Sequence, residues 1–200
     1  MSKWDSLKAS SDRFFMEVQR IHAHKRIMLR VVNPDYFEQF IKFVMGSRIE
    51  LKYKLIICLE LSSGSRVSEI LGLRKKDLIF KDDKIALDIV VKKKRRGEGR
   101  ELHRFGSVHP LVVKELRKFV FSLGDEDKLF TIHRSRVWEM YGKLFGIGTH
   151  SLRHSFVIWC YEKQGMTIEE IVNKMLFSSN VMAQRYYNTR VDKGVWDMFG

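Results

Sequence analysis

Apolar residues recur at helical spacing along most of this chain, and residues typical of helix ends separate the recurring stretches. Asn33 followed by Pro34 predicts a helix start, because Asn caps a first turn and Pro fits the first helical position. Apolar residues then follow at helical spacing until Gly46. The apolar run over residues 51–61 predicts a buried helix, and a shorter helix is expected over residues 67–73.

The period of the pattern changes in the middle of the chain. Residues 85–91 are mostly apolar and β-branched, which predicts a strand. The basic run over residues 92–100 predicts an exposed hairpin tip, and residues 101–108 are expected to form the return strand. Further helices are expected from Pro110 and over residues 136–145.

The C-terminal part of the chain predicts three more helices. The first carries an apolar stripe and stops at Gly165. Thr167 and Glu170 have the spacing of a capping box and begin the second, and the serines at residues 178–179 can cap a third, which carries Tyr186. Together the elements predict a mainly α-helical fold with a small antiparallel β-sheet, an α+β organisation.

Residues 1–32 are expected to form an N-terminal arm that includes a helix. Residues 1–10 are polar, which is typical of a loose terminus. From Ser11 onward, apolar residues with helical spacing predict one helix: Phe14, Val18 and Ile21. Residues 33–200 show neither an internal repeat nor a Gly/Ser-rich linker, so they predict a single domain with a short C-terminal tail.

The charge of the chain indicates a polyanionic partner. Its 200 residues include 37 Lys and Arg against 24 Asp and Glu, a net charge of +13, and the pI is about 9.8. Nucleic acid is the leading candidate, because Lys and Arg bind phosphates and release counterions. An anionic membrane surface is the rival candidate, and a basic protein with a merely solvated surface is the third interpretation.

Cysteine usage and hydropathy favour an intracellular protein. Cys58 and Cys160 lie within apolar helical patterns without the spacing of a zinc site, which predicts buried free thiols in a reducing compartment. The first residues are polar, unlike a signal peptide, and no apolar run approaches the ~20 residues that span a bilayer. We therefore expect a cytoplasmic protein without a membrane association.

Three segments together resemble the tyrosine recombinase family, the phage-integrase type. The sequence Ser-Gly-Ser-Arg-Val-Ser-Glu-Ile-Leu-Gly-Leu over residues 63–73 looks like the family segment that bears the first catalytic arginine. The basic hairpin lies where the family keeps its catalytic lysine. His150-Ser-Leu-Arg153 looks like the family's HxxR motif, and Tyr186, 33 residues after Arg153, looks like its nucleophile. The resemblance covers about residues 33–190, which are expected to form the catalytic domain.

The resemblance implies an activity and an assembly. It implies a site-specific DNA recombinase or integrase that breaks and rejoins double-stranded DNA through a covalent 3′-phosphotyrosine intermediate, without a metal or cofactor. Since the family uses four protomers for an exchange, we expect a homotetramer on DNA and a monomer or weak oligomer off it. A virus, plasmid or other mobile element is the expected source of such a protein.

The resemblance also implies roles for individual residues, and elementary chemistry agrees for the arginines and the tyrosine. Guanidinium forks match phosphate oxygens and stay charged, and neighbouring arginines favour the phenolate of a tyrosine, which otherwise ionises near pH 10. The implied catalytic residues are Arg66, Lys92, His150, Arg153 and Tyr186. Supporting roles fall to Glu69, His154 and Phe177, and DNA backbone binding to Lys93, Lys94, Arg95 and Arg96.

Several of these residues also have a plainer interpretation. Arg66 can be a surface arginine, Arg153 a partner in a helix-face ion pair, and His150 a helix N-cap or a buried histidine with satisfied hydrogen bonds. Glu69 either orients Arg66 or is a solvated helix charge. Lys92 begins a run of five cations, which is usually a solvated patch that grips a phosphate backbone.

The chain departs from the family in three respects. Phe177 stands nine residues before Tyr186, where the family usually has His or Trp, and Phe has no hydrogen-bonding group. The hairpin tip holds several lysines, so Lys93 and Lys94 are rivals of Lys92 as the catalytic lysine. The N-terminal arm is too short for the family's separate DNA-clamping domain, so we expect either a catalytic fragment or a minimal enzyme.

Three alternative functions follow from the departures and from the charge. A DNA-binding relative that has lost catalysis would explain the missing donor at Phe177. A type IB topoisomerase-like enzyme shares the tyrosine chemistry. A basic RNA-binding module is the least favoured, because the expected hairpin strands lack the usual aromatic stacking motifs.

Overall fold

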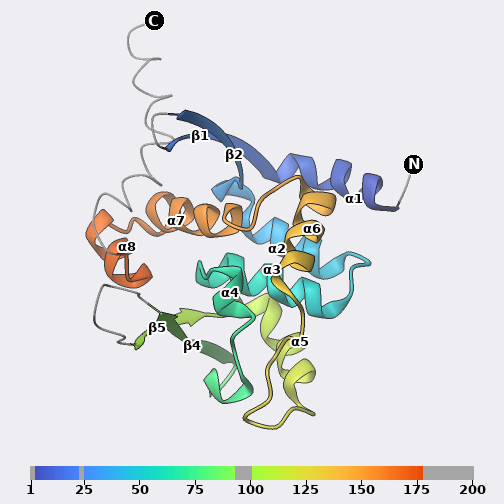
Figure 1. The fold of residues 1–200 in the computed structure, drawn as a ribbon, viewed down its shortest axis with the longest axis vertical. Helices are drawn as coiled ribbons and strands as arrows, with labels where there is room; N and C mark the ends of the chain where they lie inside the picture. The colour runs from blue at the N-terminus through green and yellow to red at the C-terminus, as the bar shows by residue number, and fades with distance from the viewer. Residues whose placement is uncertain (1–2, 23–24, 93–100, 178–200) are drawn as a thin grey trace, which may run out of the picture.

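The computed structural model describes residues 3–22, 25–92 and 101–177 (Figure 1). Its helices are α1 (Lys3–Ser11), α2 (Phe37–Gly46), α3 (Leu51–Ser63), α4 (Val67–Ile70), α5 (Pro110–Val120), α6 (Arg134–Phe145), α7 (Ser151–Gln164) and α8 (Ile168–Met175). Its strands are β1 (Phe15–His22), β2 (Lys25–Val32), β3 (Leu78–Lys81), β4 (Lys84–Lys92) and β5 (Glu101–Ser107). The predicted mainly helical fold with a small antiparallel sheet is confirmed, and the structure adds a second antiparallel sheet, β1–β2, that was not predicted.

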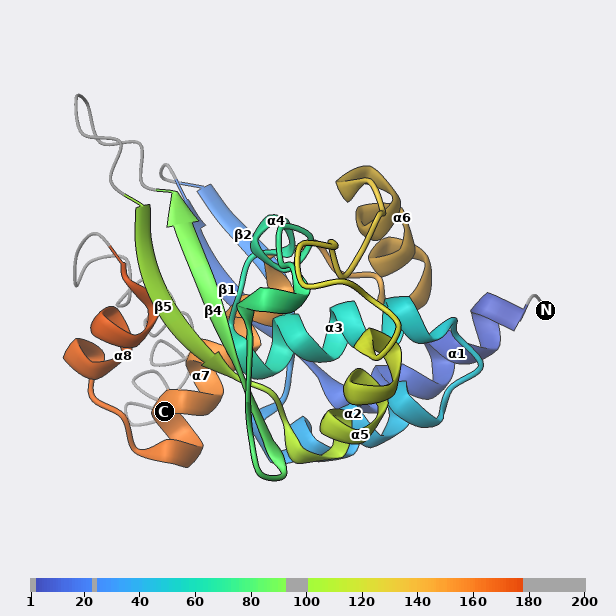
Figure 2. The same cartoon turned by 90° about the horizontal axis from the view of Figure 1, so that it is seen from below.

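The elements lie in layers. The β1–β2 hairpin covers α7 on one side, α2 and α3 lie in the middle, and the β3–β4–β5 sheet lies with α5 on the opposite side (Figure 1). Figure 2 shows α3 crossing the centre of the molecule between these layers. Most buried apolar residues belong to one core cluster, to which all three layers contribute.

Helix α3 is the centre of this core. Its residues 55–61 are apolar on every face except at Glu60, and a helix that is apolar all round must be buried. It packs against α2, α4, α5, α7 and β5, and each of its residues 55–63 is buried. The predicted buried helix is confirmed, and it continues beyond its predicted end to Ser63.

Strand β4 shows the alternation expected of a half-buried strand. Ile85, Leu87, Ile89 and Val91 are buried, whereas the residues between them are partly exposed. β4 pairs antiparallel with β5 and with β3. The sequence analysis did not predict β3. This strand has four residues, and Leu78 is the one that is buried, so the strand lacks the alternation of buried and exposed residues that β4 shows.

Several helix starts follow the predicted capping chemistry. The Asn33 side chain accepts a hydrogen bond from a backbone amide at 3.0 Å, and a 3-10 turn (Pro34–Tyr36) leads into α2. Thr167 and Glu170 form the predicted capping box of α8. The helix predicted over residues 67–73 is shorter than expected, because it corresponds to α4, which ends at Ile70. The third predicted C-terminal helix lies outside the described residues.

The N-terminal arm is where the sequence prediction is wrong. Residues 3–11 form α1 instead of a loose end, and the helix predicted from Ser11 is a 3-10 turn followed by β1. A spacing of four, as between Phe14 and Val18, occurs on one face of a strand as well as of a helix and does not decide between them; in the structure Phe14 is buried in the 3-10 turn and Val18 is buried in β1. Pairing with β2 along the whole length of β1 decides in favour of the strand.

The β1–β2 hairpin is fastened to α7 by polar and apolar contacts. The Val32 backbone amide donates to Ser155 Oγ at 2.8 Å, and Ser155 Oγ in turn donates to the Ser151 carbonyl at 2.8 Å. A small apolar cluster lies beside these bonds and is made of Val18, Val31 and Ile158.

Both cysteines are buried free thiols, as predicted. Burial raises the pKa of Cys58 and of Cys160, the latter to about 12. Neither thiol is therefore a ready nucleophile.

Glu60 is a buried carboxyl group in the middle of α3. The Tyr141 hydroxyl of α6 donates to Glu60 Oε2 at 2.6 Å, and no hydrogen-bond partner of Oε1 is found among the described residues. Burial raises the pKa of Glu60 to about 8, because loss of water outweighs the Tyr141 hydrogen bond and the charge of Arg153. The folded protein therefore holds this proton up to about pH 8, whereas the unfolded chain releases it near pH 4.5.

Glu60→Gln is expected to remove part of the pH dependence of stability. Between about pH 5 and 8 the folded protein binds more protons at this position than the unfolded chain, so the free energy of unfolding falls as pH rises. The slope from one such group is at most about 1.4 kcal/mol per pH unit. Glutamine is neutral throughout, so the stability of Glu60→Gln relative to wild type should rise across this range, as measured by urea denaturation.

The exposed carboxylate of Glu169 on α8 offers a matched control for this experiment. Glu169→Gln is expected to keep the wild-type dependence of stability on pH. If the curves of wild type and Glu60→Gln run parallel, Glu60 is ionised in the folded protein and the assignment of the proton is wrong.

Candidate active site

Arg66 and Glu69 face each other at the start of α4. Gly64 ends α3 in the left-handed conformation, and the backbone is extended at Arg66, where the next helix begins. The Glu69 carboxylate accepts hydrogen bonds from the Arg66 backbone amide at 2.9 Å and from the Arg66 guanidinium at 2.6 Å. The Arg66 side chain is 39% exposed and that of Glu69 is 8% exposed. Arg66 can therefore contact a ligand while the largely buried Glu69 carboxylate holds its guanidinium in place.

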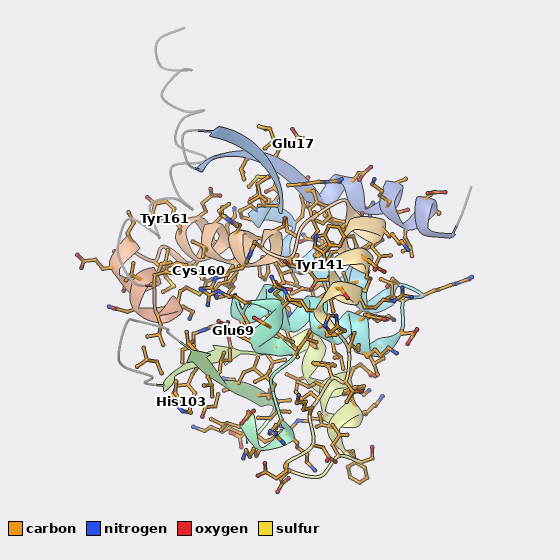
Figure 3. The ribbon with its side chains drawn as sticks, viewed as in Figure 1. Glu17, Glu69, His103, Tyr141, Cys160 and Tyr161 are labelled. Carbon is orange, nitrogen blue, oxygen red and sulfur yellow. The ribbon has the colours of Figure 1, made fainter. Side chains whose placement is uncertain are left out.

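Arg153 reaches the same carboxylate from α7. It is the third residue of that helix and only 1% exposed. Its Nη1 donates to the Gly64 carbonyl at 2.7 Å and lies 3.7 Å from Glu69 Oε2. The structure therefore brings together the two arginines that the sequence singles out, with Glu69 lying between α7 and β5 (Figure 3).

Arg104 of β5 is a third arginine in this place, and the sequence analysis missed it. It is 4% exposed, and its Nη2 donates to Ser65 Oγ at 2.7 Å and to Glu69 Oε2 at 3.2 Å. The sequence signal that could have identified Arg104 was the alternation of inward- and outward-facing residues along the return strand. Arg104 falls on the same face as Leu102 and Gly106, which makes it a cation at an inward position.

The C-terminus of α3 supplies the acceptors that hold two of these arginines. Arg104 Nη1 donates to the Ser63 carbonyl at 3.0 Å, next to the Gly64 carbonyl that Arg153 binds. The last carbonyls of a helix lack helical partners and carry the negative end of its dipole. Two buried guanidiniums thus satisfy a helix end that would otherwise be unpaired.

The three arginines outnumber the acid at their centre. We call Arg66, Arg104, Arg153 and Glu69 the arginine cluster. With three guanidiniums and one carboxylate, the cluster carries an excess of two positive charges. Burial on its own would raise the pKa of Glu69, but the backbone hydrogen bond and the three guanidiniums lower it, so the carboxylate is ionised. Burial lowers the pKa of Arg104, and Glu69 opposes that effect.

The two histidines of the motif lie in the first turn of α7 with different environments. His150 occupies the N-cap position and is exposed. His154 is 1% exposed, and its backbone amide donates to the His150 carbonyl at 3.0 Å. His150 is therefore the one of the two that can meet a ligand from solvent.

Phe177 contacts the cluster through Arg153. It is 6% exposed, and the Arg153 guanidinium carbon lies 5.1 Å from the centre of its ring. This is a cation–π arrangement, which holds a guanidinium without offering a hydrogen-bond donor to a ligand. Phe177 thus supports an arginine directly, a contact that the sequence analysis did not anticipate.

Other predicted site residues lie at or beyond the limits of the described structure. Lys92 is the last residue of β4, where its backbone pairs with Glu101 of β5. Lys93, Lys94, Arg95, Arg96 and Tyr186 lie outside the described residues. Their predicted roles therefore stay predictions.

A cavity of about 670 Å³ opens beside Arg66. It runs past the 3-10 turn Lys75–Asp77 toward β4, and its cationic lining consists of Arg66, Arg74, Lys76 and Lys128. Acidic side chains interrupt this lining at Glu69, Asp77 and Asp88. The cavity extends the positive surface outward from the exposed face of Arg66.

The described segments, residues 3–22, 25–92 and 101–177, contain no group of three or more His, Cys, Asp or Glu side chains that could hold a metal ion. None of their helices is long and apolar enough to cross a membrane.

The sequence matches one protein family over most of its length. The model of the phage integrase family matches residues 30–193. No curated protein matches the sequence at a significant level.

Solved structures share the fold. The XerH site-specific recombinase bound to its difH substrate is 16% identical with a TM-score of 0.63, over 82% of this chain and 51% of that chain. The Tn1549 transposon integrase in complex with transposon right end DNA is 20% identical with a TM-score of 0.54, over 78% and 61%. The catalytic domain of bacteriophage HP1 integrase is 18% identical with a TM-score of 0.53, over 84% and 94%. This chain thus spans about half of the XerH chain.

Gly64→Ala is expected to lower the free energy of unfolding by several kcal/mol. A Cβ atom at this position would lie 2.3 Å from Phe156 Cδ1 and 2.8 Å from Met175 Cε. Such overpacking costs roughly 1–3 kcal/mol, and the left-handed conformation adds about 1–2 kcal/mol for alanine. Chemical denaturation of the purified variant measures the loss.

Gly165→Ala is the matched control for this prediction. Gly165 has nearly the same conformation, φ +62° against +64°, but no atom lies within 4 Å of the added Cβ. Its loss should be limited to the conformational part, about 1–2 kcal/mol. If the free energy of unfolding falls equally in the two variants, the side chains around Gly64 move to make room for the methyl group.

Proposed function

The chain belongs to the phage integrase family, and from this premise we propose that it is a site-specific DNA recombinase. It breaks and rejoins double-stranded DNA through a covalent bond between Tyr186 and a 3′ phosphate. The observation that carries the proposal is the arginine cluster, whose excess of two positive charges includes the exposed Arg66. A partly buried excess of this kind is suited to an anion, and a phosphodiester matches the forked donors.

The cluster is suited to the transition state of phosphoryl transfer. Arg66 and Arg153 bind the two non-bridging oxygens, whose negative charge increases as the phosphorus becomes pentacoordinate. Since Glu69 and the α3 carbonyls already hold the guanidiniums, little reorganisation is needed when that charge develops. The arginines thereby supply positive charge that a metal supplies in other phosphoryl-transfer enzymes.

The bond changes balance within the protein and the DNA. The Tyr186 oxygen forms a bond to phosphorus as the bond from phosphorus to the 5′ oxygen breaks. The tyrosine proton passes to His150 or to water, and the departing 5′ oxygen takes a proton from Lys92. The phosphotyrosine keeps the phosphoester for resealing, when a 5′ hydroxyl attacks it in the reverse direction.

Duplex DNA is the proposed partner. The net charge of +13 and the cationic lining of the cavity beside Arg66 favour a phosphate backbone. The Tn1549 integrase structure is described as a complex with transposon right end DNA, and the same kind of partner is proposed for this chain. Lys93, Lys94, Arg95 and Arg96 add backbone contacts. Four copies assemble on DNA for a complete exchange, inside the cell that houses the mobile element.

A DNA-binding protein without catalysis is the second candidate function. Phe177 favours it, because the ring stacks on Arg153 and cannot donate a hydrogen bond to a phosphate oxygen. Formation of a detergent-resistant protein–DNA adduct by the wild-type protein excludes this candidate.

Tyr186→Phe is expected to abolish the covalent adduct, whereas Tyr187→Phe keeps it. The sequence predicts a helix over these two adjacent residues, and adjacent residues of a helix point about 100° apart, so in that helix one of them alone would face the arginine cluster. The assay incubates a nicked, end-labelled suicide duplex with each variant and resolves the products under denaturing conditions. Loss of the adduct in Tyr187→Phe with retention in Tyr186→Phe would reverse the assignment.

Lys92→Ala is expected to slow cleavage of ordinary DNA about 100-fold, a typical contribution of a general acid. Its defect should nearly vanish on DNA with sulfur at the bridging 5′ position, because a thiolate leaves without protonation. Single-turnover rates on the two substrates measure the effect. An equal defect on both substrates would mean that Lys92 is not the acid.

Two neighbouring variants serve as controls for Lys92. Lys93→Ala and Lys94→Ala should show the same modest change on both substrates if they only bind the backbone. Rescue by sulfur in one of them, and not in Lys92→Ala, would transfer the role of the acid to that lysine.

A further inference from the structure

Arg104 is a buried cation that the proposed chemistry does not use directly. Its side chain is 3% exposed, so it lies behind the surface that Arg66 presents at 39% exposure. Its two terminal nitrogens make three hydrogen bonds, to the Ser63 carbonyl, Ser65 Oγ and Glu69 Oε2. Both terminal nitrogens are thus engaged by neighbouring protein groups, whereas no hydrogen-bond partner of the buried Nε is found among the described residues.

The two carboxylate oxygens of Glu69 accept hydrogen bonds from different donors. Oε1 accepts from the Arg66 guanidinium at 2.6 Å. Oε2 accepts from the Arg66 backbone amide at 2.9 Å and from Arg104 at 3.2 Å, and Arg153 stands further off at 3.7 Å. Arg104 thus fixes the rotation of the carboxylate, and with it the direction from which Arg66 is held.

We propose that Arg104 is a positioning residue for cleavage, which orients Arg66 through Glu69 and keeps Arg153 from closing onto that carboxylate. The inference rests on the proposed function for its effect on rate. Without Arg104, Oε2 loses a close cationic partner, and Arg153 is the nearest cation that can replace it. A closer Arg153–Glu69 pair would draw Arg153 away from the phosphate position.

A purely structural role of Arg104 would be met by any cation at this place. Removing one member of a buried ion pair leaves its partner uncompensated, which is strongly destabilising, so an apolar side chain is not a neutral replacement. Lysine would keep the charge, but its single ammonium group cannot reproduce the fork that bonds three acceptors at once. The geometry of the fork, more than the charge, is therefore the property that the site requires.

The test compares Arg104→Lys and Arg104→Met with a matched arginine elsewhere. Arg117 of α5 stacks on Phe80 and donates to the Asp82 carbonyl, away from the arginine cluster, so Arg117→Met is the control. We expect single-turnover adduct formation to fall about 100-fold in both Arg104 variants, as for a small misplacement of a catalytic group. DNA affinity should change little in both variants and thermal stability should change little in Arg104→Lys, which keeps the charge, and the control should cleave at the wild-type rate. A wild-type cleavage rate in Arg104→Lys would overturn the proposal.

A double-variant cycle separates positioning from general damage. Since Arg104 acts partly through Arg66, adding Arg104→Met to Arg66→Ala should lower the rate by clearly less than about 100-fold further, because the part that runs through Arg66 is already lost and only the effect on Arg153 remains. A full 100-fold further loss would overturn the proposal. Should Arg104→Met fail to fold, Ser65→Ala, which removes one acceptor of Arg104, takes its place and is expected to lower the rate to a smaller extent.

Side-chain NMR on DNA-free protein labelled with ¹⁵N-arginine tests positioning without any cleavage. The Arg66 guanidinium signal, identified by its absence in Arg66→Lys, should be restricted in rotation in wild type and averaged in Arg104→Lys. An unchanged signal in Arg104→Lys would overturn the inference. If wild type forms no adduct but this signal changes as expected, the proposed function fails while the positioning of Arg66 by Arg104 stands.

Discussion

One carboxylate shared among three arginines is the constraint on which the rest of this structure depends. Glu69 lies within 4 Å of guanidiniums from α4, β5 and α7, and two of these also bind the last carbonyls of α3. Four elements therefore meet at the C-terminal end of the central helix. Removing the carboxylate would leave three cations in mutual repulsion, two of them buried, which is why these elements must keep their places together.

Backbone geometry at the end of α3 makes this meeting possible. Gly64 adopts the left-handed conformation directly beneath Phe156 and Met175, where a Cβ has no room. Gly106 plays the corresponding part on β5, since a Cβ there would lie 2.7 Å from the Ser63 side chain. The close approach of β5 allows Arg104 to reach the α3 carbonyls, and the same strand pairs with β4 up to Lys92. The close packing of β5 on α3 and the charge pairing of Arg104 therefore both depend on the C-terminal end of α3.

Local signals carried much of the prediction. Arg66 and Glu69 are three residues apart at the start of α4, a spacing that allowed a contact, and the structure shows the pair. The buried α3, the strand β4 and the caps at Asn33 and Thr167 followed from period and capping chemistry. Arg104 was missed because its partners lie 35 to 41 residues earlier in the chain, and only the alternation of β5 marked it as inward-facing.

The sequence by itself determined the helical class of the fold, because helices depend on contacts within a few residues. The family motifs and the order in which they occur are also read directly from the sequence. Tertiary structure decided that residues 15–22 form a strand, since spacing of four fits both periods and pairing with β2 breaks the tie. It also decided that Phe177 stacks on Arg153 and that Arg104 completes the cluster. Such contacts join residues distant in sequence, and the free energy that selects them comes from burial and charge pairing in three dimensions.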